Sequence, residues 1–193
     1  MELINGYLIS QIFITINYFF MAISYYSKNR KRILFCSLIS ILTVGTAYII
    51  LHAWSGLAMC LVSLIRNIIF EIDVKKNGES KEINKKDIII LIVLYVMIIA
   101  SAIITYDGIF SLLSIIATML FTYSVWQKNT ITYKILGVPN EVIWILYNIY
   151  IKSLFSVILE IILLACCIIG YMIERKEKNK LTNIFNNSIV HKS

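Results

Sequence analysis

Three charged residues lie inside long apolar runs of the sequence, where few charges occur. Arg66, Glu141 and Glu160 each stand well inside such a run. Within a membrane such a charge costs about 2.5–3.5 kcal/mol on insertion scales, so it is a candidate for function and needs a partner. At 1.5 Å of rise per residue, each carboxylate lies within about 10 Å of Arg66 in membrane depth. Either carboxylate could therefore pair with the guanidinium.

The pattern favours a polar cavity between the helices that carry these charges. Arg66 and Glu160, with the amides of Asn148 and Asn17, would line this cavity and bind a small polar solute, and Glu160 could hold a proton. The alternative is a buried ion pair that only fixes helix packing, with the Arg66 side chain otherwise extending toward the cytoplasm. The residues alone do not favour one interpretation over the other.

Three other side chains could contact the same solute. Trp144 lies on one helix face with Glu141 and Asn148, so its indole could stack on a flat ligand such as a nucleobase or a vitamin ring. Helix packing is the alternative use of this indole. Glu141 follows Pro139, and a distorted helix there could let its carboxylate reach interfacial water. Ser63 lies on the polar face of the third apolar run.

The sequence lacks the residue arrangements typical of an enzyme. His52 and His191 have no carboxylate, cysteine or serine at catalytic spacing, and no glycine-rich phosphate loop occurs. The four cysteines fall in apolar runs without the spacing of metal ligands, so we interpret them as packing residues. We expect no enzymatic activity, no cofactor and no metal.

The composition is typical of a membrane protein. Hydrophobic residues make up 59% of the chain, charged residues make up 15%, and the mean hydropathy is +0.81. A soluble domain carries about a quarter charged residues, because its surface faces water. The net charge of +7 does not indicate nucleic-acid binding, since the basic residues form short segments between apolar runs without interleaved aromatic residues. The principal partner is therefore the lipid bilayer.

Seven apolar segments are suited to cross a bilayer as helices. A run of about 20 residues spans the hydrocarbon core of about 30 Å, and a helix satisfies its backbone polar groups within one segment. The sequence predicts one polytopic membrane domain over residues 1–175 and a flexible cytoplasmic tail over 176–193. The predicted spans are 3–26, 33–51, 56–72, 88–106, 109–126, 135–151 and 153–173.

The basic residues predict the orientation of these spans. With the N-terminus outside and the C-terminus inside, 16 of the 18 Lys and Arg residues lie on the cytoplasmic side, as the positive-inside rule requires. Lys152 faces out, and Arg66 lies within a span. Aromatic residues near the span ends are placed like interfacial anchors; they are Trp54, Tyr106, Trp126 and the pair Tyr25-Tyr26.

Polar residues divide the spans into two groups of three. Every span except the fourth carries small or polar residues at helical spacing, and such a stripe faces other helices or a cavity. The fourth span is almost purely apolar and can face lipid. The sequence therefore predicts an all-α protein of two three-helix bundles, over about 3–72 and 109–173, joined by a linker helix over 88–106. Two parallel three-helix repeats require such a linker.

Short motifs in this layout resemble the YgjV family of bacterial inner membrane proteins. They are Trp144-Ile145-Leu146-Tyr147-Asn148, followed by Ser153 and Glu160, and Gly45 followed by Ser63-Leu64-Ile65-Arg66. The likeness covers roughly residues 10–175, although the family pattern would have an amide at Ser63. It implies a multi-pass protein of the bacterial plasma membrane with a fold similar to the SWEET and PnuC-type transporters, which have 3+1+3 helices. It implies no particular substrate.

Two classes of function remain open. A transporter-like protein would bind or move a small polar metabolite by alternating access. The alternative is a non-transporting scaffold, accessory or sensory subunit, in which the intramembrane charges are structural and the cytoplasmic lysines bind anionic lipid or a partner. Either kind of protein could form a homo-oligomer.

Overall fold

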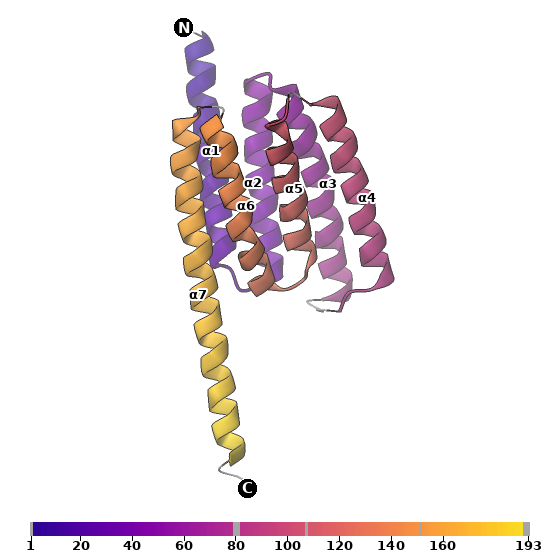
Figure 1. Ribbon diagram of the computed structural model, residues 1–193, viewed down its shortest axis with the longest axis vertical. Helices are drawn as coiled ribbons and strands as arrows, with labels where there is room; N and C mark the ends of the chain where they lie inside the picture. The colour runs from indigo at the N-terminus through magenta and orange to yellow at the C-terminus, as the bar shows by residue number, and fades with distance from the viewer. Residues whose placement is uncertain (1, 79–81, 107, 151, 191–193) are drawn as a thin grey trace.

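The described part of the chain folds into seven α-helices (Figure 1). The computed structural model describes residues 2–78, 82–106, 108–150 and 152–190, and no strand occurs among them. The seven-helix, all-α prediction is confirmed. The helices are α1 (Glu2–Tyr26), α2 (Arg30–Ile50), α3 (Trp54–Asn77), α4 (Lys85–Ile104), α5 (Ser111–Trp126), α6 (Thr130–Tyr150) and α7 (Leu154–Val190).

The helices form two layers that meet along two seams. Helices α1, α2 and α3 pack side by side in one layer, and α5, α6 and α7 pack side by side in the other. The layers meet where α1 packs on α7 and where α3 contacts α5. Helix α4 lies at the edge of the bundle, against α3 and α5 (Figure 1). This arrangement agrees with the predicted grouping of three helices, a linker helix and three more helices.

The surface of the bundle is apolar, as contact with lipid requires. By length and composition, four helical segments could cross a membrane: Gly6–Tyr26, Arg30–Ile50, Lys85–Ile104 and Leu154–Thr182. Leu112–Trp126 is a shorter apolar helix. Arg66 in α3 and Glu141 in α6 lower the hydropathy of these two helices. Large exposed side chains on α4, such as Ile92, Val96 and Ile103, would be costly in water and are favourable in lipid.

The two ends of the bundle differ in charge. Helices α1, α3 and α5 end, and α2, α4 and α6 begin, at the end from which α7 extends (Figure 1). We call this end the basic end, because it carries Lys28, the run Arg30–Arg32, Lys75, Lys76, Lys85, Lys86, Lys128 and Lys134. The orientation predicted above puts the basic end in the cytoplasm.

Helix α7 continues beyond the bundle. The segment after residue 175 was expected to be a flexible tail, but α7 runs without a break to Val190. No Pro or Gly follows Gly170, and the charged segment after it is made of Glu, Lys and Arg, which are good helix formers.

Two glycines allow α1, α6 and α7 to approach closely. A Cβ atom on Gly170 of α7 would lie 2.2 Å from the backbone oxygen of Tyr25 on α1. A Cβ atom on Gly137 of α6 would lie 2.7 Å from Cys167 Sγ and 2.8 Å from the Tyr25 ring. Small residues that bring helix backbones together are typical of membrane proteins. These contacts hold Tyr25 in place, and its side chain is fully buried.

We predict that Gly170→Ala destabilises the bundle. The added methyl group meets backbone rather than a movable side chain, so α1 and α7 must separate, at a cost of about 1–3 kcal/mol. The measurement is the melting temperature of the purified protein in detergent. Gly45→Ala is the matched control, because a Cβ atom there meets Cys60 at an ordinary 3.9 Å. Equal melting temperatures for the two variants would contradict the close approach.

Candidate functional site

Two glutamates from adjacent helices form a pair of buried carboxyl groups. Glu141 on α6 and Glu160 on α7 are only 2% and 6% exposed, and their carboxyl groups lie within hydrogen-bonding reach of each other. Helix α6 continues through Pro139, so Glu141 faces the interior of the bundle and not interfacial water. We call Glu141 and Glu160 the carboxyl pair.

Tyrosines and amides on two helices donate hydrogen bonds to the carboxyl pair. Tyr18 Oη on α1 donates to Glu160 Oε1 at 2.7 Å, and Asn148 Nδ2 donates to the same oxygen at 3.5 Å. Tyr25 Oη donates to Glu141 Oε1, which also accepts from Asn140 Nδ2 at 3.1 Å. The pair is therefore held by α1 and by its own two helices.

The carboxyl pair has no cationic partner among the described residues. No lysine, arginine or histidine there lies within ion-pair distance of either carboxyl group. Two buried acceptor atoms in this region, Glu160 Oε2 and Asn140 Oδ1, also lack a hydrogen-bond partner. A buried acceptor without a donor is costly, so these two atoms are the unsatisfied polar atoms of this region.

Arg66 is buried in a different part of the bundle. Its guanidinium donates to Thr122 Oγ1 at 3.0 Å and to Asn67 Oδ1 at 3.2 Å, and it lies 4.9 Å from the centroid of the Phe121 ring. The suggestion that Arg66 pairs with Glu141 or Glu160 is wrong for this structure, because no such ion pair forms among the described residues.

Aromatic contacts lead from the arginine to the carboxyl pair. The Phe121 ring below Arg66 meets the Tyr133 ring edge-on at 6.1 Å, and Tyr133 stacks on Tyr25 at 5.4 Å. Tyr25 in turn donates to Glu141. The guanidinium of Arg66 and the carboxyl pair are thus separated by aromatic rings, and they do not form a direct ion pair.

The structure brings together some of the predicted site residues and not others. Glu160, Glu141 and Asn148 lie in one site. Asn17 instead accepts a hydrogen bond from Ser40 on α2. Trp144 is half-buried and meets Tyr147 of its own helix edge-on at 5.7 Å, and Ser63 is half-buried on α3.

Other buried polar side chains pair across helices in the same interior. Asn67 Nδ2 on α3 donates to Ser37 Oγ on α2 at 2.8 Å, and Ser24 Oγ on α1 lies 2.8 Å from Tyr133 Oη on α6. We call these groups, with Arg66 and the carboxyl pair, the polar interior. In this structure the groups of the polar interior contact one another, in the region where the sequence predicted a solute-binding cavity.

The tyrosines of the site are residues that sequence reasoning missed. Tyr18 and Tyr25 are seven residues apart and so share one face of α1, which was the available signal. Tyr25 was interpreted instead as an interfacial anchor, but its side chain is 0% exposed. Trp126 is also buried, whereas Trp54 and Tyr106 are exposed, as anchors would be.

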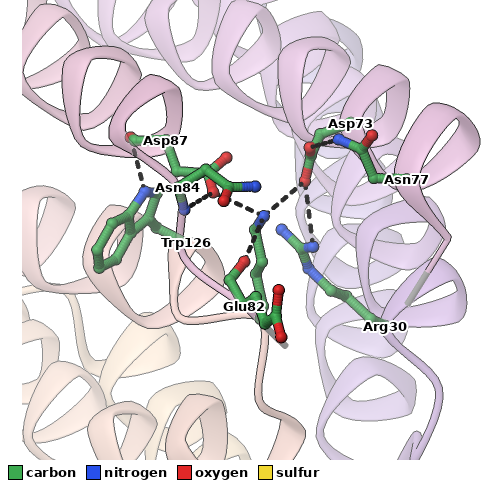
Figure 2. A network of polar contacts seen from close by, with 8 residues as sticks. Arg30, Asp73, Asn77, Glu82, Asn84, Asp87 and Trp126 are labelled. Atoms are coloured by element: carbon green, nitrogen blue, oxygen red, sulfur yellow. Dashed lines mark hydrogen bonds and ion pairs between the residues drawn. The ribbon is translucent and has the colours of Figure 1, made fainter. Parts of the chain in front are cut away.

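A cluster of buried charges closes the basic end between four helices (Figure 2). Lys128 Nζ lies 2.8 Å from Asp87 Oδ2 and 3.5 Å from Asp73 Oδ2, and Arg30 Nη1 lies 3.4 Å from Asp73 Oδ2. Lys128 also donates to the Glu82 carbonyl oxygen, and Trp126 donates to that of Asp87. We call Arg30, Asp73, Asp87 and Lys128 the charge cluster; it ties α2 and α3 to α4 and to the segment between α5 and α6.

Two ion pairs fasten α7 at the same end. Lys134 Nζ on α6 lies 2.5 Å from Glu174 Oε2, and Lys28 Nζ, between α1 and α2, lies 2.5 Å from Glu177 Oε2. The Lys134 side chain is fully buried, whereas the second pair is exposed and contributes little. Both layers are therefore joined by charges at the basic end.

Two cavities also lie at the basic end. One has a volume of about 10 Å³, room for about one water molecule, and is lined by residues that include Arg30, Lys128 and Tyr133. A surface cleft of about 430 Å³ is bounded by residues that include Tyr26, Lys28 and Arg32. Neither is lined by Arg66 or the carboxyl pair. The described residues include no group of three His, Cys, Asp or Glu that could hold a metal ion.

Comparison with known proteins gives one family. The model of the Imp-YgjV family, described as a bacterial inner membrane protein, matches residues 8–178. No curated protein and no solved structure matches the chain.

We predict that Lys128→Met destabilises the folded protein. It removes the cation between Asp73 and Asp87, and breaking a buried pair of this kind costs about 3 kcal/mol. Melting in detergent measures the loss. Lys75→Met, at an exposed position on α3, is the control, and adding Asp87→Asn to Lys128→Met should recover part of the stability. If Lys128→Met melts like Lys75→Met, the charge cluster does not hold the basic end.

Proposed function

The chain belongs to the Imp-YgjV family of bacterial inner membrane proteins, and from this premise we propose that it is a transporter-like protein that binds a small polar solute inside the helix bundle. The observation that carries the proposal is the presence of buried charges of opposite sign that do not pair. Arg66 lies between α3 and α5, and the carboxyl pair lies between α6 and α7. If these charges only fixed helix packing, direct pairing would be the most stable arrangement.

A polar solute could take the place of the internal contacts. A guanidinium offers planar N–H donors suited to a carboxylate, phosphate or carbonyl group, and the carboxyl pair offers acceptors to hydroxyl or amino groups. Such a solute would bind when Phe121, Tyr133 and Tyr25 move apart, and their rings could stack on a flat ligand. The solute would replace contacts that the closed bundle already makes.

The architecture supports alternating access to this site. The two layers meet at α1 and α7 and at α3 and α5, with α4 at the edge. Motion of one layer against the other would open the polar interior to one side at a time, as in transporters built from two repeats. The charge cluster would then have to break when the basic end opens. On this proposal the chain is akin to the SWEET and PnuC-type transporters.

A non-transporting scaffold is the second candidate. The observation in its favour is that the polar interior is largely satisfied by its own side chains, such as Asn67 with Ser37 and Asn17 with Ser40. In a scaffold these hydrogen bonds would serve packing alone, and the basic end would contact anionic lipid or a partner protein.

Thermal-shift measurements on the purified protein distinguish the two candidates. The panel contains nucleosides, B vitamins, sugars and amino acids, and each compound is tested on the native chain, Arg66→Gln and Glu160→Gln. We expect one solute class to raise the melting temperature of the native protein and to have no effect on either folded variant. Arg32→Gln and Glu71→Gln, outside the polar interior, are the charge-matched controls and should respond like the native chain.

Two outcomes would count against the transporter. If no compound shifts the native protein, and both interior variants melt far below it, the charges are structural and the scaffold is favoured. If a compound stabilises the native protein and the two interior variants equally, it binds outside the polar interior.

A further inference from the structure

We infer that Glu141 and Glu160 share one bound proton, so that the carboxyl pair is a proton-binding site within the membrane. This inference deepens the proposed function. Binding of a proton by the pair does not depend on transport, but a role of that proton in coupling transport to the proton gradient rests on the proposed function. Two buried carboxyl groups that face each other from adjacent helices are the observation behind it.

The geometry of the pair requires a proton. Two ionised carboxylates within hydrogen-bonding reach repel each other strongly, and burial from water magnifies this repulsion. A proton on one carboxyl group removes one of the two charges. It also supplies a donor between the two groups, where Glu160 Oε2 otherwise has no hydrogen-bond partner.

The titratable groups nearest to the pair on the described helices α1, α2, α6 and α7 are tyrosines and a cysteine. The titratable side chains that face the pair are Tyr18 and Tyr25 from α1, Tyr48 from α2, Tyr133 from α6 and Cys167 from α7. Helix α5 carries no charged residue. The nearby Lys134 is paired with Glu174 toward the basic end. Arg66 on α3 lies over the Phe121 ring, and among the described residues no cation forms an ion pair with either carboxyl group.

The ligands around the pair fit a proton better than a metal cation. Sodium and other hard cations are bound by oxygen atoms, but here the groups that point at the carboxyl oxygens are two tyrosine hydroxyls and the amide nitrogens of Asn140 and Asn148. Neither of the two cavities reaches the pair. A proton needs no additional space.

A chain of side chains leads from the pair to the basic end. Tyr25, which donates to Glu141, stacks on Tyr133, and the Tyr133 hydroxyl lies 2.8 Å from Ser24 Oγ. Tyr133 also lines the cavity of about 10 Å³, together with Arg30 and Lys128 of the charge cluster. This cavity has room for about one water. A proton could thus exchange with the basic end by small motions of Tyr25 and Tyr133.

Infrared spectroscopy of the native protein in liposomes tests the inference. A protonated carboxyl group has a C=O stretching band that shifts in D₂O and that ionised carboxylates lack. We expect this band at neutral pH in the native protein and in Glu71→Gln, and its loss in the double variant Glu141→Gln, Glu160→Gln. Because the proton is shared, each single variant must alter the same band.

Three results would overturn the shared proton. They are absence of the band in the native protein, a band that only one of the two single variants changes, and a band that disappears when sodium replaces choline at constant pH. Should a glutamine variant fail to fold, Tyr18→Phe replaces it: loss of one hydroxyl donor must move the band, whereas Tyr106→Phe at an exposed position must not. No solute is needed, so failure here leaves the solute panel to decide the proposed function.

Discussion

The structure depends on one constraint, which is that polar groups inside the membrane can be satisfied only by the protein. Lipid offers neither donors nor acceptors, so a buried amide, hydroxyl or charge must find its partner within the protein, on its own helix or on a neighbouring one. The contacts Asn67 with Ser37 and Tyr18 with Glu160 meet this requirement between α2 and α3 and between α1 and α7. The close approach at Gly170 brings α1 near enough to α7 for the second contact. The close packing of α1 on α7 is thus what allows the polar contact between them to form.

The same constraint gives the two ends and the middle of the bundle different properties. At the basic end, Lys128 and Arg30 meet two aspartates, and the charges neutralise one another. In the middle, Arg66 and the carboxyl pair contact neutral donors, acceptors and rings, and their charges are not neutralised by each other. Under the proposed function, the charge cluster holds the basic end together. A ligand that supplies charges complementary to Arg66 and the carboxyl pair could then open the bundle.

Much of the fold could be predicted from the sequence because it is encoded locally. Apolar run length predicts a spanning helix wherever it occurs, and the apolar fourth run predicts the peripheral α4. Glu160 and Asn148 were found because a polar residue in an apolar run stands out. The partners of Arg66 could not be found in this way, since they depend on how α3 and α5 are rotated and on the Phe121 ring. The helical extension of α7 is local and was missed because a charged segment was equated with a flexible one.

The central claim is that the groups of the polar interior are buried against one another, and an interior of this kind is closed to water from both sides. The most direct measurement is labelling of Ser24→Cys and Thr122→Cys, both fully buried, with a membrane-impermeant maleimide in oriented vesicles. The four native cysteines are replaced first, and Lys152→Cys and Lys180→Cys report the outer and basic sides. The account predicts that the two reporters label from opposite sides and that both interior positions stay unlabelled. Labelling of Ser24→Cys or Thr122→Cys at the rate of a reporter would contradict it, because the interior would then be open to water on the side of that reporter.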